Sequence, residues 1–166
     1  MEMEKNAEIT RDEHRAEYQG SVLLRCRRRI KGGKYVIAPG TTAIAAYAFA
    51  DNTTVEEVEI PPSVRVIGSH AFMGCRKLHS VVLPDALKVI PCAAFMGCSH
   101  IVTAVLPRKL EYIGEGAFMD CHLLNTVQIP GGVKGIDNDA FAYTNLPAVQ
   151  LPRGLIFLGD NAFYPM

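Results

Sequence analysis

An Ala-Phe pair recurs along this 166-residue chain at an almost constant spacing, and this repeat restricts the fold more than any other feature of the sequence. The pairs are Ala48-Phe49, Ala71-Phe72, Ala94-Phe95, Ala117-Phe118, Ala140-Phe141 and Ala162-Phe163. The phenylalanines recur with a period of about 23 residues, and only the last interval is shorter, by a single position. A period of this length is typical of proteins built from stacked supersecondary units.

Four more positions in each repeat are apolar, and we call each set of equivalent positions a column. The column five residues before each Phe contains Ile44, Ile67, Ile90, Ile113, Ile136 and Leu158. The column eight residues before contains Val64, Leu87, Leu110, Val133 and Leu155, with Thr41 in the first repeat. Twelve residues before lie Ile37, Ile60, Leu83, Leu106, Ile129 and Leu151, and fourteen before lie Tyr35, Val58, Val81, Ala104, Val127 and Val149. Columns in register predict equivalent coils that bury equivalent positions.

Each repeat is predicted to contain a short strand, because its apolar residues alternate as side chains do across a strand. Val81 and Leu83 then face the core while Val82 faces outwards, and the following proline ends the pairing because it has no N–H to donate. Six coils stacked about 4.8 Å apart would share one core, with the phenylalanines aligned in a single spine. A hydrophobic content of 49% suits one elongated domain of this kind.

Residues 1–34 precede the repeats and are predicted to form an N-terminal cap on a repeat domain of residues 35–166. Thr10 followed by Glu13 is a capping-box pattern, which predicts a short helix through about Gln19 that stops at Gly20. A terminal unit with a polar outer face protects the open end of a stack of repeats.

A basic strand is predicted next, from Ser21 to Lys31, turned by Gly32-Gly33 into the first repeat. Its cationic residues are Arg25, Arg27, Arg28, Arg29 and Lys31. One interpretation is a solvated edge strand whose charges prevent edge-to-edge pairing. The alternative is a patch that binds an anion or nucleic acid, although no aromatic residue alternates with the arginines as stacking on bases requires. Pairing with the acidic residues of segment 1–20 is a third interpretation.

One repeat contains, in order, Val58-Glu59-Ile60-Pro61, Val64, Ile67-Gly68, Ala71-Phe72, Cys75 and Leu78. These residues resemble the BspA-type leucine-rich repeat, V-x-I-P-x-x-V-x-x-I-G-x-x-A-F-x-x-C-x-x-L, and the resemblance extends over about residues 35–166. It implies a β-rich member of the α/β repeat class, a right-handed leucine-rich-repeat solenoid of about six 23-residue coils with an N-terminal cap.

The same resemblance implies a bacterial protein that binds other proteins without catalysis, since many such proteins are exported to the cell surface and those understood bind host or matrix proteins. The chain departs from the family pattern by lacking an export signal, and the edge repeats drift at Ala38, Thr41 and a deletion near Tyr143-Pro147. The chain as written is therefore predicted to be cytoplasmic, or at the cell surface if it is a fragment of a longer protein.

Three of the five cysteines, Cys75, Cys98 and Cys121, occupy the column three residues after Phe. We interpret them as small, weakly polar side chains that hydrogen-bond backbone in a buried turn. A zinc site would need His79, His100 and His122 beside them, yet each histidine has a different spacing from its cysteine. Cys26 and Cys92 lie outside the column, and the odd number of cysteines suits a reducing compartment.

No catalytic arrangement, cofactor motif or membrane segment was identified, so an enzyme is not expected. The glycine pairs Gly32-Gly33 and Gly131-Gly132 lack the Lys-Ser/Thr ending of a phosphate loop. Seventeen basic and seventeen acidic residues balance, which gives no global reason to expect nucleic acid or an anionic membrane as partner. No apolar run approaches the roughly 20 residues of a membrane helix.

The outward-facing columns of the strand are the predicted protein-binding surface. Its predicted residues are Glu57, Glu59, Ser80, Val82, Thr103, Val105, Thr126, Gln128 and Gln150. Valine and threonine pairs there form an uncharged centre beside Glu57 and Glu59, as in an interface core with a polar rim. Alternatively, β-branched residues only suit a strand. A second outward column contains Val66, Val89, Tyr112 and Phe157.

The C-terminal residues stop within a coil and include no polar cap, which predicts an apolar open end and self-association through it. The sequence therefore predicts a protein-interaction module whose partner is a protein of unknown identity. A structural segment of a larger surface or adhesion protein is the alternative, and anion or nucleic-acid binding by residues 25–34 is the third.

Overall fold

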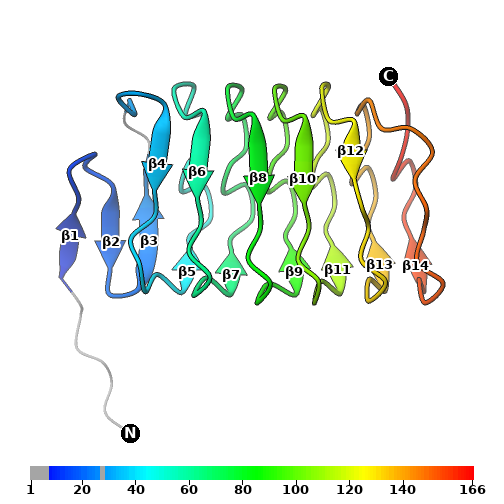
Figure 1. Ribbon diagram of the computed structural model, residues 1–166, viewed down its shortest axis with the longest axis horizontal. Helices are drawn as coiled ribbons and strands as arrows, with labels where there is room; N and C mark the ends of the chain where they lie inside the picture. The colour runs from blue at the N-terminus through cyan, green and yellow to red at the C-terminus, as the bar shows by residue number, and fades with distance from the viewer. Residues whose placement is uncertain (1–7, 27–28) are drawn as a thin grey trace, which may run out of the picture.

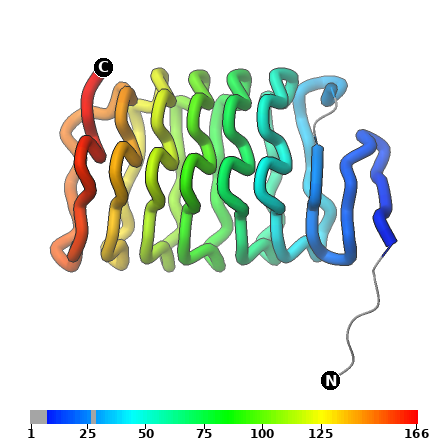
Figure 2. Tube along the Cα trace, turned by 180° about the vertical axis from the view of Figure 1, so that it is seen from behind, coloured from blue at the N-terminus to red at the C-terminus, as the bar shows by residue number. Residues whose placement is uncertain are grey.

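A computed structural model describes residues 8–26 and 29–166, which form an elongated stack of coils (Figure 1). One long side of the stack, the first face, consists of β4 (Lys34–Val36), β6 (Glu57–Glu59), β8 (Ser80–Val82), β10 (Thr103–Val105) and β12 (Thr126–Val127). A second face consists of β5 (Ala43–Ile44), β7 (Val66–Ile67), β9 (Val89–Ile90), β11 (Tyr112–Ile113), β13 (Gly135–Ile136) and β14 (Phe157–Leu158). Figure 2 shows the turns that run along the back of the same coils.

Parallel pairing between equivalent positions joins neighbouring coils, except between β6 and β8 and between β7 and β9. Val82 pairs with Val105 on the first face, and Ile90 pairs with Ile113 on the second. The first face contains a β4-β6 pair and a β8-β10-β12 sheet, while β9, β11, β13 and β14 form one sheet on the second face. This register confirms the prediction that the repeats form equivalent coils.

The six repeat phenylalanines form a single stack through the core. Neighbouring ring centroids lie 4.8 to 5.3 Å apart with interplanar angles of 4° to 11°. The first five rings are fully buried, and Phe163 is half-buried in the last coil. The stacking distance is close to the spacing of hydrogen-bonded strands, so ring stacking and strand pairing support the same repeat along the stack.

Two turns in each of the first five coils place a residue at positive φ, two positions before and two positions after the phenylalanine, and the last coil has only the first of them, at Asn161. His70 (φ 60°) and Gly74 (φ 69°) occupy these positions around Phe72. Glycine adopts this conformation without strain, whereas other residues rarely do. Non-glycine residues nevertheless occupy most of these turns, including Ala93 at φ 51°.

The predicted N-terminal helix is wrong. Residues 10–19 instead form a hairpin of β1 (Ile9–Arg11) and β2 (Glu17–Gln19), and the residues that the structure describes contain no helix. The hairpin turn is closed by Asp12, whose Oδ1 accepts the Ala16 N–H at 2.8 Å. So short a helix has little stability of its own, whereas the hairpin pairs with the stack and buries Tyr18. The β-rich solenoid is therefore observed, without the helical part of the α/β class.

The interpretation of the basic segment as an edge strand is also wrong. The strand, β3 (Val22–Arg25), is shorter than predicted and is paired on both sides, with β2 and with β5. Cys26, just after β3, lies one repeat period before Phe49 and occupies the equivalent position. Its N–H donates to the Ala48 carbonyl at 2.6 Å. Among the described residues of this segment, Leu23 and Cys26 are therefore buried, while Arg25 and Arg29 are exposed.

Candidate interaction surface

Parallel pairing aligns the columns of most predicted binding residues on the first face, whereas Gln150 lies in a segment that pairs with no strand. Val82 is 61% exposed and Val105 is 49% exposed, and they are direct partners in the register. Beside them lie Ser80 and Thr103, which are also paired. The remaining predicted residues, all exposed, are Glu57, Glu59, Thr126, Gln128 and Gln150.

Charge divides the first face into two parts. At its N-terminal part, the Lys34 ammonium lies 3.1 Å from the Glu57 carboxylate and also pairs with Glu59. Hydrogen bonds to Glu59 and then Glu57 raise the pKa of Lys34. Towards the C-terminus, the outward residues of β8, β10 and β12 are valine, serine and threonine. The uncharged part is where desolvation by a partner is least opposed.

A shallow hollow of about 560 Å³ lies over β10 and β12. Its lining includes Thr103, Val105, Thr126, Gln128 and Arg108. Four of these five residues belong to the first face or its predicted binding columns, so the uncharged part of that face is concave at its C-terminal side.

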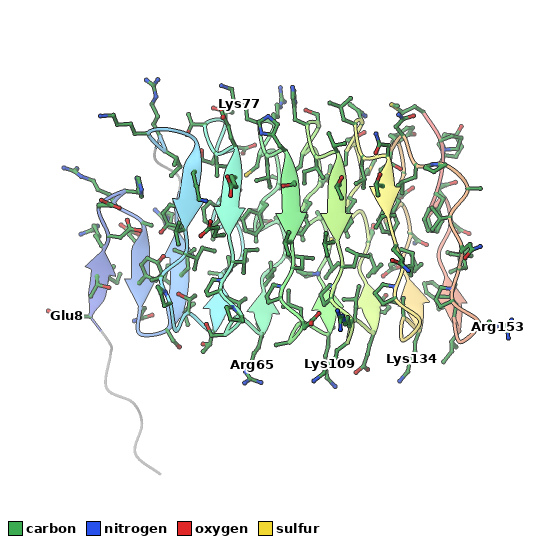
Figure 3. The ribbon with its side chains drawn as sticks, viewed as in Figure 1. Glu8, Arg65, Lys77, Lys109, Lys134 and Arg153 are labelled. Carbon is green, nitrogen blue, oxygen red and sulfur yellow. The ribbon has the colours of Figure 1, made fainter. Side chains whose placement is uncertain are left out.

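The second face carries an ion-paired row and a restrained aromatic side chain. The Glu111 carboxylate lies 2.9 Å from the Lys88 ammonium and 3.9 Å from that of Lys134. Tyr112 is half-buried, and its hydroxyl donates to Asp137 Oδ2 at 2.6 Å. Figure 3 shows Arg65, Lys109 and Lys134 extending from this edge of the stack. The second face is therefore more charged than the uncharged part of the first.

Tyr112 belongs to the second outward column, but its ring is held in place by neighbouring residues and is not free to contact a partner. A Cβ on Gly135, in the next coil, would lie 2.6 Å from the Tyr112 ring, so the absence of a side chain at Gly135 lets the ring lie flat across that coil. The hydrogen bond to Asp137, and then burial, raise the pKa of Tyr112 to about 12. Phe157 in the last coil remains exposed.

The basic residues of the predicted anion site are only partly gathered. Arg25 Nε lies 4.0 Å from Glu17 Oε2, so an acidic residue of segment 1–20 partly neutralises it. Arg29 and Lys31 line a hollow of about 640 Å³ together with Lys77 and Glu56. Arg27 and Arg28 lie outside the described residues. The anion site remains a prediction, and the Glu56 carboxylate within the hollow opposes it.

The cysteine column forms a buried ladder. The thiols of Cys75, Cys98 and Cys121 lie 3.1, 3.0 and 3.2 Å from the carbonyl oxygens of Phe49, Phe72 and Phe95, to which they donate. Asn52 makes the equivalent bond to the Cys26 carbonyl at 3.0 Å, whereas Thr144 donates within its own turn. The structural interpretation of these cysteines is confirmed.

The histidines of the alternative zinc site do not join this ladder. His79, His100 and His122 are exposed, while the thiols are fully buried against backbone carbonyls. Burial raises the pKa of Cys98 and of Cys121 above the usual range of a thiol. In residues 8–26 and 29–166, no group of three His, Cys, Asp or Glu side chains is arranged to hold a metal ion.

Thiol reactivity tests the ladder. We expect one of the five thiols, Cys92, to react with a disulfide reagent in the native protein, because only Cys92 is incompletely buried. Burial, followed by the carboxylates of Glu115 and Asp137, raises the pKa of the Cys92 thiol. Since the thiolate is the nucleophile, its reaction should be slower than that of free cysteine at pH 8 and should accelerate as the pH rises further. Two or more fast-reacting thiols before denaturation would contradict a buried ladder.

The open end of the last coil exposes apolar side chains. Ile156, Leu158, Tyr164 and Met166 are all exposed there. This surface is the predicted site of self-association, which remains a prediction. Across the described part of the chain, no helix has the length and apolar character needed to cross a membrane.

Residues 42–166 match, as six copies, a family described as the BspA type leucine rich repeat region. No curated protein matches the chain in sequence. Among solved structures, the chain is similar to a leucine rich cell surface protein from Faecalibacterium prausnitzii A2-165, at 29% identity and a TM-score of 0.78. The similarity covers 95% of this chain and 43% of that one, so this chain spans less than half of the Faecalibacterium protein's length.

The chain is also similar to the leucine rich repeat protein TpLRR of T. pallidum, at 29% identity and a TM-score of 0.66, over 95% of this chain and 85% of that chain. A leucine-rich repeat protein from Eubacterium ventriosum ATCC 27560 aligns at 19% identity with a TM-score of 0.74, over 98% of this chain and 50% of that chain. At that identity the likeness to the Eubacterium protein concerns the fold alone.

Proposed function

Because the chain belongs to the BspA-type leucine-rich repeat family, we propose that it is a protein-interaction module whose first face binds a partner protein. The observation that carries the proposal is the paired and uncharged row of Ser80, Val82, Thr103 and Val105, in which Thr103 is half-buried and the other three are exposed. Interface cores are depleted in charge and surrounded by a polar rim, and Glu57 with Glu59 supplies such a rim on one side.

The partner is inferred to be a protein because the first face offers a broad, shallow surface. A small-molecule site usually buries most of its ligand within a cleft. The coils also hold this surface rigid, since each strand rests on the buried phenylalanine stack. A rigid surface loses little conformational freedom on binding.

A structural role within a larger surface protein is the second candidate. It is supported by the Faecalibacterium relative, which is described as a cell surface protein and is more than twice as long as the matched region. In that role the coils act as a spacer between other parts of a longer protein, and the first face needs no partner. A location at the cell surface is part of the same proposal.

Two matched pairs of variants separate these functions. Val82→Arg and Val105→Arg place a charge on the first face, whereas Val66→Arg and Val89→Arg place it at comparably exposed valines on the second face. We expect capture of a partner protein by the immobilised chain to fall at least tenfold for the first pair, because a central contact typically contributes more than about 1.4 kcal/mol.

The second-face pair should capture the partner as the unaltered chain does. Equal capture by all four variants would reject the first face as the binding surface and favour the structural role. Circular dichroism of each variant controls for folding, and all four side chains are expected to be tolerated because they extend into solvent.

A further inference from the structure

The last coil separates from the rest of the first face after β12. Figure 1 shows β14 beside β13, whereas the first-face segment of the last coil, residues 146–152, diverges from β12. The start of this segment is still attached, since the Asn145 N–H donates to the Leu124 carbonyl at 3.0 Å. Beyond it, residues 146–152 form no strand, and β12 pairs with β10 only.

The shortened repeat explains this separation. In the preceding coils an apolar residue lies six positions after Phe and is buried, namely Val55, Leu78, Ile101 and Leu124. In the last repeat, Leu146 lies only five positions after Phe141 and is half-buried. Pro147, which has no counterpart in the other repeats, also lacks the N–H group that a continuous strand would donate.

A groove of about 560 Å³ lies where the strand pairing is lost. One wall is formed by residues 125–129 and the other by residues 146–153. A second hollow of about 370 Å³ lies on the inner side of the diverging segment, lined by Leu146, Val149, Leu151 and Phe163 among others. The segment therefore does not pair with β12, although Leu146 and Val149 still pack against the core as partly buried side chains.

The edge of β12 leaves backbone groups available in this groove. In two of the preceding coils the residue twelve before Phe donates forward, the Ile37 N–H to the Glu59 carbonyl at 3.0 Å and the Leu83 N–H to the Val105 carbonyl at 3.1 Å. β12 is the last strand of its sheet, and the N–H of Ile129, the equivalent residue beside the groove, donates to no backbone carbonyl of the described residues. Backbone groups at a sheet edge are ready to pair with an added strand.

We propose that this groove binds an extended peptide segment of a partner protein as a strand added parallel to β12. The peptide would carry apolar residues at alternate positions and a carboxylate after them. Strand addition gives affinity through backbone hydrogen bonds and specificity through alternate side chains. The proposal deepens the proposed function and rests on it, since Thr126, Gln128 and Gln150 belong to both the groove and the predicted binding surface.

The charge of Arg153 is the reason for expecting a carboxylate in the peptide. Arg153 is the only charged residue in the lining of the groove, and the described residues place no carboxylate within 4.0 Å of its guanidinium. Figure 3 shows its side chain extending into solvent at this end of the stack. Asp85 and Arg108 occupy equivalent positions in two neighbouring coils, and Asp85 Oδ1 accepts the backbone N–H of Arg108 at 3.1 Å. Arg153 occupies that same column, ten residues before Phe163.

The chain's own β8 segment therefore supplies a probe. A fluorescent peptide of residues 78–86, Leu-His-Ser-Val-Val-Leu-Pro-Asp-Ala, would place its Asp beside Arg153 when its valines align with β12. We expect saturable binding by fluorescence anisotropy with a Kd below about 1 mM. Replacing that Asp by Asn in the peptide should weaken binding about threefold, as for one exposed ion pair. An absence of binding up to about 1 mM peptide would overturn the proposal.

Two protein variants test the location of the peptide. A serine inserted between Asn145 and Leu146 restores the spacing of the other repeats, so the last coil should pair with β12 and peptide affinity should fall at least tenfold. Ala148→Trp, at an exposed position in the groove wall, should block the groove to a similar extent without altering the core. Unchanged binding by either folded variant would overturn the proposal.

Val82→Arg distinguishes this proposal from the broader one. It lies on β8, outside the groove, so it should leave peptide affinity unchanged while reducing capture of the whole partner. If Val82→Arg leaves both peptide affinity and partner capture unchanged, that result would support the groove as the peptide site. It would also reject the central part of the first face as the surface that binds the whole partner. Loss of peptide binding in Val82→Arg would reject the groove as the peptide site.

Discussion

Replacing Gly68 by alanine is expected to lower the free energy of unfolding by about 3 kcal/mol or more, because the added atom has no space. A Cβ at this position would lie 2.3 Å from the backbone nitrogen of Ala46 and 2.6 Å from its Cα. These atoms belong to the backbone of the preceding coil, so they can move only if the two coils separate. Urea unfolding followed by circular dichroism measures the loss.

Gly131→Ala is the matched control. A Cβ at Gly131 would meet no atom within 4 Å, and its φ is not positive. This variant should change the free energy of unfolding by less than about 0.5 kcal/mol. A similar loss in both variants would mean that the close approach of coils at Gly68 is not a determinant of stability.

Phe95→Ala is expected to destabilise the protein by about 4 kcal/mol, through lost burial and the cavity that remains. The Phe95 ring is fully buried, and both neighbouring rings, those of Phe72 and Phe118, lie 5.1 Å away. Its removal interrupts the stack at its centre, where the coils on either side rest on the same ring. Thermal and urea unfolding both report this loss.

Phe157→Ala provides the comparison for this second variant. Phe157 lies outside the stack on β14 and is 48% exposed, so its replacement should have an effect below about 1 kcal/mol. Equal destabilisation by the two replacements would contradict a stability that depends on the central stack.

The repeat spacing was sufficient to predict the interior of this protein. The apolar columns, the phenylalanine stack and the hydrogen-bonding role of Cys75, Cys98 and Cys121 follow from positions that must be buried alike in every coil. Columns of outward residues, such as Val82 and Val105, could be predicted for the same reason. Whether those residues bind a partner is a matter of surface chemistry, which the repeat does not determine.

The N-terminal region was harder to predict because it lies outside the phenylalanine pattern. Thr10 and Glu13 have the spacing of a capping box, but Arg11 and Glu17 instead pair across a hairpin with their charged atoms 2.9 Å apart. Tertiary pairing decided the conformation of this short segment. Cys26 could have been recognised as part of the first coil, since it lies one repeat period before Phe49.

The groove beside β12 depends on a single missing residue. The sequence predicted a deletion near Tyr143-Pro147, but the spacing alone does not determine whether the coil tightens locally or separates from its neighbour. In the structure β14 on the second face still pairs with β13. The missing residue therefore alters the first-face side of the coil. Pro147, which is absent from the equivalent position of the other repeats, favours this outcome because it cannot donate to a ladder.

Photo-cross-linking from the two faces tests directly whether the first face binds the partner protein. A photoreactive amino acid is placed singly at Val82, Val105, Val66 or Val89, and each protein is irradiated with the captured partner. The account predicts an adduct of one common mass from positions 82 and 105, and none from positions 66 and 89. Adducts from the second face alone, or equally from both faces, would contradict a binding function for the first face.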